Sequence, residues 1–202
     1  MDFVAIDFET ANELATSACE LGLAVVRNYN VVETRNWLIR PPELRFSPYN
    51  TKIHGISAGD VADVPRFDIL WNEIQPYLEG ELVIAHNADF DLASVLKNLL
   101  YHYSLPYKDI KYVCSIKLAK KAFDGFYSYG LKNVSKELGI KLDHHRAESD
   151  AHACAIIASR AFRTYNVSFV HELGPKMNVA VSLLKSADKP FVKRKAFRKK
   201  TV

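Results

Sequence analysis

Short apolar runs spaced as β-strands open the chain. Phe3–Phe8 has the pattern of a buried strand, and Glu20–Arg27 (ELGLAVVR) has a second. The segment NYN then turns the chain into Val31–Ile39, which Pro41 and Pro42 stop. Three consecutive strands with short connections predict an antiparallel meander.

Helical patterns alternate with short strands in the rest of the chain. The predicted helices are Pro65–Leu78, Asp89–Tyr101, Ser115–Phe123, Leu131–Leu138 and Ala147–Tyr165, and the predicted strands are Glu81–Ala85 and Tyr112–Cys114. The stretch with Pro48, Gly55 and Gly59 predicts a loop. Strands first and strand–helix alternation afterwards predict an α/β or α+β layer fold, with a mixed sheet flanked by helices.

Two acids follow the apolar half of the first strand. Side chains alternate across a strand, so Asp7 and Glu9 project from the same face, with Cα atoms about 6–7 Å apart. Two bare carboxylates cannot be buried together without protonation, so they need a cation or solvent. The pair therefore fits either a site for a hard divalent ion or a solvated strand end.

A second group of acids ends a buried strand and opens a helix, in the segment His86–Asp91 (HNADFD). Asp89 sits where a helix N-cap is expected, and we interpret it as a cap. Asp91 lies one turn further on, beside the apolar face. Asp91 is therefore the acid of this segment that we consider for chemistry.

The third group lies in Asp143–Ala155 (DHHRAESDAHACA). Asp150 is in line with the apolar stripe of the last helix, where a carboxylate is rare unless it is paired or bound to metal. His145 precedes it and suits a general base acting on water, although a solvated loop histidine is the alternative. We interpret His144 and His152 as bystanders.

Composition narrows the class of protein. The 202 residues are 49% hydrophobic and 25% charged, as in a soluble globular protein. No apolar run is long enough to span a bilayer, and no signal peptide is evident. The three cysteines have neither disulfide nor zinc spacing, and no glycine-rich nucleotide loop or nucleophile elbow occurs. We expect a cytoplasmic protein without a membrane partner.

Charge divides the chain into two parts. Residues 176–202 hold nine Lys or Arg and one acid, a net charge of +8, whereas the remaining residues carry 18 basic and 22 acidic side chains. A basic end on an acidic body suggests a polyanionic partner, and a solvated tail is the alternative. The apolar patch Val179–Leu184 (VAVSLL) predicts a short helix that packs on another surface.

Three motifs in order carry a resemblance to a known family. Asp7-x-Glu9-Thr10, His86-Asn87-Ala88-x-Phe90-Asp91 and His145-x-Ala147-x-x-Asp150 resemble the three exonuclease motifs of the DEDDh 3′–5′ exonucleases. The resemblance covers residues 1–165 and is greatest to the stand-alone relatives of the proofreading epsilon subunit of bacterial DNA polymerase III. The spacing of the third motif selects His145 rather than His144 as the motif histidine.

The resemblance implies a ribonuclease H-like fold and two divalent metal ions, Mg²⁺ or Mn²⁺. It assigns the metal ligands to Asp7, Glu9, Asp91 and Asp150, and the general base to His145. The product would be nucleoside 5′-monophosphates. The predicted substrate contacts are Thr10, Ile53, His54, His86, Asn87 and Phe90. For Ile53 and His54 a plain anchored turn is the alternative, and we expect Phe90 to pack in the core rather than stack on a base.

The predicted organisation is an exonuclease domain over 1–170 and a basic extension over 171–202, either flexible or partner-binding. The main functional prediction is a 3′–5′ exonuclease acting on single-stranded DNA or frayed 3′ ends. An RNA exonuclease of the same fold is the first alternative, and a non-catalytic nucleic-acid-binding or docking module is the second. The basic extension would serve nucleic acid, or a polymerase or another DNA-processing protein.

Overall fold

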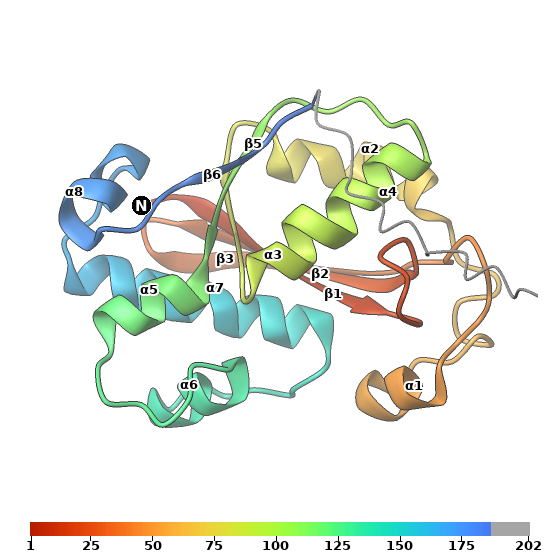
Figure 1. The fold of residues 1–202 in the computed structure, drawn as a ribbon, viewed down its shortest axis with the longest axis horizontal. Coiled ribbons are helices and arrows are strands. Elements are labelled where there is room, and N and C mark those ends of the chain that lie inside the picture. Colours follow the sequence, from red (N-terminus) through yellow and green to blue (C-terminus); the bar gives the residue numbers. More distant parts are fainter. Residues whose placement is uncertain (187–202) are drawn as a thin grey trace, which may run out of the picture.

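One mixed sheet forms the centre of the molecule in residues 1–186, the part of the chain that the computed structural model describes (Figure 1). Its strands are β1 (Phe3–Thr10), β2 (Ala18–Arg27), β3 (Asn30–Leu38), β4 (Leu82–Ala85), β5 (Ile110–Cys114) and β6 (Ser182–Leu184). The order across the sheet is β3-β2-β1-β4-β5-β6.

The strand directions confirm the predicted topology. β1, β2 and β3 form the antiparallel meander, with Asn28 and Tyr29 in the left-handed conformation at the turn between β2 and β3. β4 is parallel to β1, and β5 is parallel to β4. β6 then adds an antiparallel edge strand to β5.

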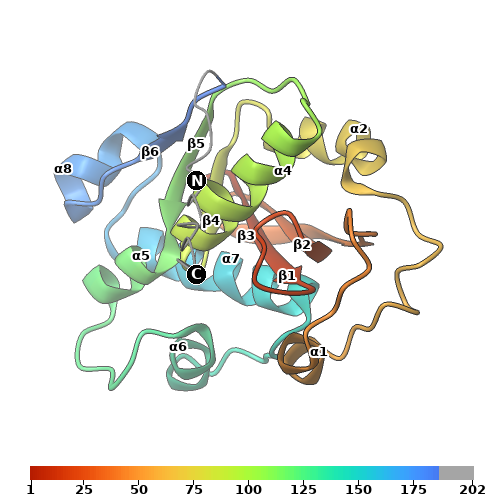
Figure 2. The same ribbon diagram turned by 45° about the vertical axis from the view of Figure 1, so that its right-hand side comes forward.

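Helices cover both faces of this sheet (Figures 1 and 2). The helical segments of the described residues are α1 (Pro48–His54), α2 (Phe67–Leu78), α3 (Ala88–Phe90), the π-helical η1 (Asp91–Leu96), α4 (Lys97–His102), α5 (Ser115–Ala122), α6 (Leu131–Glu137), α7 (Ala147–Thr164), the 3₁₀ turn η2 (Val170–Glu172) and α8 (Leu173–Met177).

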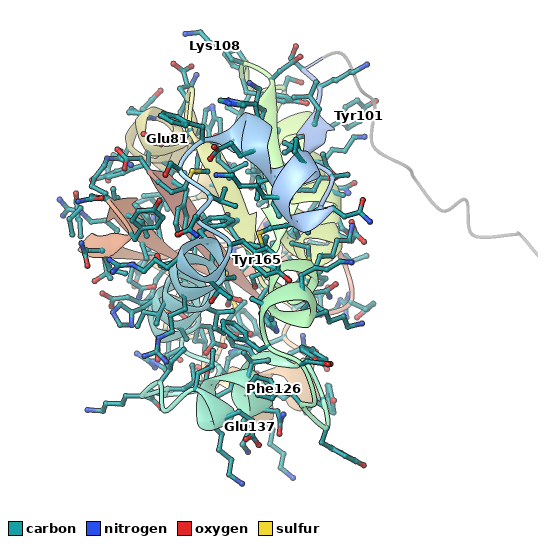
Figure 3. All side chains as sticks on the ribbon, turned by 90° about the vertical axis from the view of Figure 1, so that its left-hand side faces the viewer. Glu81, Tyr101, Lys108, Phe126, Glu137 and Tyr165 are labelled. Atoms are coloured by element: carbon teal, nitrogen blue, oxygen red, sulfur yellow. The ribbon has the colours of Figure 1, made fainter. Side chains whose placement is uncertain are left out.

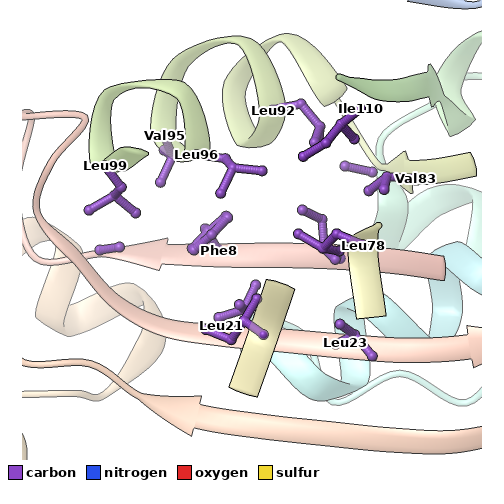
Figure 4. Packing of buried hydrophobic residues seen from close by; sticks show 14 of the residues in the cluster. Phe8, Leu21, Leu23, Leu78, Val83, Leu92, Val95, Leu96, Leu99 and Ile110 are labelled. Carbon is purple, nitrogen blue, oxygen red and sulfur yellow. The ribbon is translucent and has the colours of Figure 1, made fainter. Parts of the chain in front are cut away.

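Alternation along β1 divides its side chains between two cores. The even-numbered residues from Val4 to Phe8 pack with residues of α2, η1 and α4, and Figure 4 shows Phe8 between Leu21 of β2 and Leu96 of η1. The odd-numbered Phe3 and Ala5 pack with α7 on the opposite face. The odd-numbered acids that follow them are therefore directed to the α7 face.

The start of α7 lies directly on the backbone of β2. A Cβ atom built on Gly22 would lie 2.0 Å from the carbonyl carbon and oxygen of Ala147. No other residue type fits between strand and helix at that distance. Gly22 is opposite Asp7 in the register, so this contact brings the first turn of α7 beside the acidic end of β1.

A smaller core joins α5 and α6 to the outer side of α7. Leu131 and Val134 of α6 pack with Ile157 of α7. Figure 3 shows Phe126 and Glu137 at this end of the molecule and Lys108 at the opposite end. The connection between α6 and α7 carries His144 and His145.

Three local expectations need correction. The predicted loop at Pro48 contains α1, which begins at Pro48 and is followed by a C-cap, Gly55, with a φ of 78°. The predicted helix over Asp89–Tyr101 contains the π-helical turn η1. The predicted short helix at Val179–Leu184 is wrong, because β6 pairs there with β5. No helix within residues 1–186 is long and apolar enough to cross a membrane.

Candidate active site

Asp7, Glu9 and Asp150 come together between β1 and α7. Each offers a carboxylate oxygen, and these oxygens all lie within 4.8 Å of one another. Asp7 and Glu9 share the α7 face of β1, and Asp150 is one turn inside α7. The predicted juxtaposition of the first and third motifs is therefore present in the structure.

Asp150 is 3% exposed, as its place on the apolar stripe predicted. Its Oδ2 accepts a hydrogen bond from His144 Nδ1 at 2.9 Å and another from the backbone N–H of His145 at 3.1 Å. His144, interpreted from the sequence as a bystander, is thus the direct side-chain partner of this carboxylate. The spacing rule did not indicate this contact.

Asp91 joins the site through the backbone of β1. It is the first residue of η1, is 2% exposed, and accepts a hydrogen bond at Oδ1 from the N–H of Phe8 at 3.0 Å. Phe8 lies between Asp7 and Glu9, so this bond fixes η1 against the acidic end of β1. Asn87, with a φ of 77°, makes the turn from β4 into this helical segment.

Burial is the largest cause of a raised pKa in every one of these carboxyls, and the charges of neighbouring acids add to it. Burial is the largest cause for Asp7, followed by the charges of Asp91, Asp150 and Glu9. Burial, and then the charges of Asp150 and Glu20, raise the pKa of Glu9 to about 8.

Asp91 and Asp150 follow the same rule. Burial raises the pKa of Asp91 to about 8, although the hydrogen bond from Phe8 opposes the shift. Burial also raises the pKa of Asp150, against the influence of His144. The raised pKa values indicate that these carboxyls are unfavourable as anions unless cations are close by. Carboxylate oxygens are the ligands that hard divalent ions prefer, so the residues of this cluster fit metal binding.

His145 lies at the rim of the acidic cluster. Its Nδ1 is 3.9 Å from Glu9 Oε1, and its ring stacks on that of His144 with centroids 3.8 Å apart. Its backbone is left-handed, with a φ of 70°. Burial first, and then the proximity of His144, His54 and Lys132, lower the pKa of His145, which favours a neutral ring able to accept a proton near pH 7.

Thr10 and His54 form a second, interlocked group beside the cluster. The N–H of Ile56 donates to His54 Nδ1 at 3.0 Å, so the other nitrogen, Nε2, is the donor to the carbonyl of Thr10 at 3.2 Å. Asn50 Nδ2 donates to the same carbonyl at 2.9 Å. His54 is buried, and Ile53 beside it is partly buried. Their contact with substrate stays a prediction.

The His86–Asp91 segment contributes mainly support. His86 is hydrogen bonded at Nδ1 to Ser115 Oγ at 2.7 Å and at Nε2 to the carbonyl of Tyr129 at 2.9 Å, and burial lowers its pKa to about 4. Asn87, rather than Asp89, occupies the N-cap position of α3. Phe90 is 41% exposed, so the expectation that it packs in the core is wrong.

Glu20 and Gly22 were missed in the sequence. Both lie on β2 and point to the α7 face, opposite Glu9 and Asp7 respectively. The alternation of side chains along β2 could have identified them, because Glu20 and Gly22 are even-numbered like Ala24 and Val26, which pack with α7. An acid at an even-numbered, core-facing position of this apolar strand is expected to be a buried carboxylate with hydrogen-bond partners.

A sheet of this order, with carboxylates from β1, η1 and α7 gathered at one point, defines a nuclease of the ribonuclease H-like fold. A family model described as an exonuclease, RNase T, matches residues 4–158. The chain therefore belongs to the RNase T exonuclease family, and the predicted fold class and the DEDDh resemblance are confirmed.

Curated relatives include the 3′-5′ exonuclease DinG of Staphylococcus aureus (strain USA300), 28% identical over 166 residues. The match covers 81% of this chain and 18% of that protein, so the chain spans a small part of this relative's length. The closer likeness to the polymerase III epsilon subunit stays a prediction.

Solved structures share the fold. Exonuclease X in complex with 5′ overhanging duplex DNA is 25% identical, with a TM-score of 0.67 over 87% of this chain and 96% of that one. The nuclease domain of 3′hExo, a DEDDh family member bound to rAMP, is 16% identical with a TM-score of 0.70, covering 90% and 96%. The E. coli ExoI–ssDNA complex is 18% identical with a TM-score of 0.70, covering 88% and 44%.

Proposed function

We propose that the chain is a divalent-metal-dependent 3′–5′ exonuclease that releases nucleoside 5′-monophosphates from single-stranded DNA or frayed 3′ ends. One observation carries the proposal: carboxylate oxygens of Asp7, Glu9 and Asp150 lie within 4.8 Å of one another, and the imidazole of His145 lies 3.9 Å from Glu9. Membership of the exonuclease family supports it.

The buried acids assign the metal ligands. Asp7, Glu9 and Asp150 would hold one Mg²⁺ or Mn²⁺, and Asp7 with Asp91 would hold a second. When bound, two such ions stabilise the charge that develops on the attacking and leaving oxygens of a phosphodiester. The elevated pKa values of the carboxyls support this assignment, because the cluster lacks positive charge when the ions are absent.

His145 would take the proton of the attacking water. Its ring is partly exposed at the rim of the acidic cluster, so solvent reaches it, and its lowered pKa keeps it unprotonated near pH 7. Glu9 lies 3.9 Å from Nδ1, where it would stabilise the imidazolium that results. His144 is held on Asp150 instead and is not assigned to the water.

Thr10, with the main chain after β1, would contact the terminal nucleotide. The bonds from Asn50 and His54 to the Thr10 carbonyl hold this backbone at a fixed distance from Glu9. The neighbouring bases would contact Ile53 and the exposed side chains of Phe90 and Asn87. His86 would support the second motif through its hydrogen bond to Ser115.

RNA is the second candidate substrate. Two similar structures concern RNA or a ribonucleotide: the 3′hExo nuclease domain is bound to rAMP, and another structure concerns 3′-end specific recognition of histone mRNA stem-loop by 3′-exonuclease. Exonuclease X and E. coli ExoI are bound to DNA. We favour DNA because Exonuclease X is the most identical of these four chains.

The protein would act in the cytoplasm in proofreading, repair or end-trimming.

An exonuclease domain over 1–170 followed by a basic extension is the organisation we propose, although α8 and β6 extend the described fold beyond residue 170. A polymerase or another DNA-processing protein would bind the basic extension, of which residues 187–202 lie outside the described residues. The ExoI/SSB-Ct complex shows a similar fold with a protein partner.

Matched 5′-labelled substrates test the proposal: single-stranded DNA, single-stranded RNA of the same sequence, and a duplex with a 3′ mismatch. We expect the label to remain on a ladder of shortening DNA, with RNA degraded more slowly and the mismatched duplex trimmed from its frayed end. Faster degradation of RNA than of DNA would identify RNA, the second candidate, as the preferred substrate. Immediate release of the label as a mononucleotide would overturn the 3′–5′ polarity.

A further inference from the structure

Glu20 is a buried acid outside the predicted catalytic set. It lies on β2 opposite Glu9 and is 1% exposed. Its Oε1 accepts a hydrogen bond from Asn36 Nδ2 at 2.9 Å, and its Oε2 accepts one from the backbone N–H of Ala147 at 3.2 Å. Both oxygens are therefore engaged by protein donors, which indicates a supporting role rather than that of a metal ligand.

The hydrogen bond to Ala147 caps α7 from the sheet. The N-cap residue of α7, Arg146, makes no side-chain capping bond, although the first N–H groups of any helix lack partners within the helix. Glu20 supplies the acceptor from a neighbouring strand. A carboxylate at this end of a helix also interacts favourably with the helix dipole.

Two further contacts locate the same turn of α7. Gly22 allows Ala147 to rest directly on the β2 backbone, and the Thr34 hydroxyl of β3 donates to the Glu148 carboxylate. Asp150 follows Ala147 by three residues, so any shift of the first turn moves its carboxylate relative to Asp7 and Glu9. Of these contacts, the hydrogen bond to the Ala147 N–H is the one made by a buried carboxyl group.

We propose that Glu20 is a positioning residue: by capping α7 from β2, it holds the Asp150 carboxylate against Asp7 and Glu9 and thereby sets the affinity of the site for divalent ions. This inference rests on the proposed metal-dependent function and adds a residue that contacts neither the ions nor the substrate. Residues that orient metal ligands typically contribute tenfold to a hundredfold to metal affinity or activity.

Three variants separate the cap from charge and from stability. Glu20→Ala removes both hydrogen bonds. Glu20→Gln can accept from Ala147 and donate to a flipped Asn36 amide, so it keeps the geometry without the charge. Glu137→Ala is the control, because it removes an exposed acid from α6, outside the contacts that locate the first turn of α7.

The readouts are Mn²⁺ binding, measured by electron paramagnetic resonance without substrate, and the Mg²⁺ dependence of activity on single-stranded DNA. We expect Glu20→Ala to weaken Mn²⁺ binding by about tenfold or more. At saturating Mg²⁺, the fold-decrease in kcat of Glu20→Ala should be much smaller than the fold-decrease in its Mn²⁺ affinity. Glu20→Gln should recover most of the affinity, and Glu137→Ala should bind as the wild type does.

Three results would overturn the inference. Glu20→Ala with a lowered melting temperature and unchanged Mn²⁺ affinity would make Glu20 purely structural. Mn²⁺ binding by Glu20→Gln that is as weak as binding by Glu20→Ala would show that the charge of Glu20, rather than the helix cap, matters. If Glu20→Ala does not fold, Asn36→Ala, which removes one of the two donors, must weaken Mn²⁺ binding, and unchanged binding would contradict the proposal. A wild-type protein that binds no Mn²⁺ would instead overturn the metal-dependent function itself.

Discussion

His144 and His145 are adjacent in sequence but contact different carboxylates. His144 donates to Asp150, whereas His145 faces Glu9 at the rim of the cluster. The spacing of the third motif selected His145, whose backbone N–H rather than its ring bonds to Asp150, and its role as the base stays a prediction. Sequence alone did not indicate the contact of His144, because it depends on how the connection after α6 folds over α7.

Substituting the two histidines separates their roles. His145→Ala should lower kcat on single-stranded DNA by about 10²–10⁴-fold, because it removes the proposed proton acceptor. His144→Ala should have a mild effect at saturating Mg²⁺, because bound ions replace its interaction with Asp150. Steady-state kinetics with both variants checks this, and the reverse order of effects would reassign the base to His144.

The elevated pKa values of the carboxyls make the metal-free protein sensitive to pH. Glu9 and Asp91 keep their protons up to about pH 8 in the folded state, whereas an unfolded chain ionises them near their ordinary values of 4.5 and 3.8. The folded state therefore binds more protons between these limits, and the free energy of unfolding falls as pH rises through this window.

We expect the melting temperature in EDTA to fall by roughly 5 °C or more between pH 5 and pH 8. Mg²⁺ should reduce the fall, since the ions replace the protons, and Asp91→Asn should reduce it in EDTA. Calorimetry at a series of pH values measures this. A melting temperature in EDTA that is flat or rises over the same range would contradict the pKa shifts.

At the scale of elements, the contact between β2 and α7 determines the site. Asp150 reaches β1 because Gly22 allows the helix to lie on the strand. Gly22→Ala should destabilise the protein by about 1–3 kcal/mol and weaken metal binding, because the new Cβ would lie 2.0 Å from Ala147 backbone atoms. Gly59→Ala is the control, since the nearest atom to its Cβ, Ser57 Oγ, would be 3.7 Å away.

Denaturant unfolding and Mn²⁺ titration of the two glycine variants check this prediction. Equal stability and equal metal binding in Gly22→Ala and Gly59→Ala would show that α7 is not held in place by this contact.

The long periodic elements were predictable from the sequence, and the short ones were not. The first meander and the helix over Ala147–Thr164 have apolar patterns long enough to identify. α1 has seven residues, from Pro48 to the residue before Gly55, and β6 has three residues at an edge, too few to establish a period. The role of Glu20 depends on pairing between strands, which no local pattern contains.

At the scale of the molecule, charge is divided between an acidic body and a basic C-terminal end. Residues 187–202 hold seven Lys or Arg and one acid. Deleting them should weaken binding to single-stranded DNA and flatten its salt dependence, because fewer counterions are released, while leaving the Mg²⁺ dependence of cleavage intact. The truncation must keep β6, whose loss would expose the edge of β5.

Binding titrations at several salt concentrations measure the slope for the full chain and for residues 1–186. An unchanged slope would mean that the basic end contacts a protein partner or aids solubility instead of holding nucleic acid.

The central claim is that the acids of β1, η1 and α7 hold the divalent ions that drive cleavage from the 3′ end. Its most direct test is degradation of 5′-labelled single-stranded DNA by protein stripped with EDTA and then supplied with Mg²⁺ or Mn²⁺, alongside Asp150→Asn. We predict no cleavage after chelation, recovery with either ion, and little recovery in the variant. Cleavage that survives chelation, or full activity in Asp150→Asn, would contradict the account.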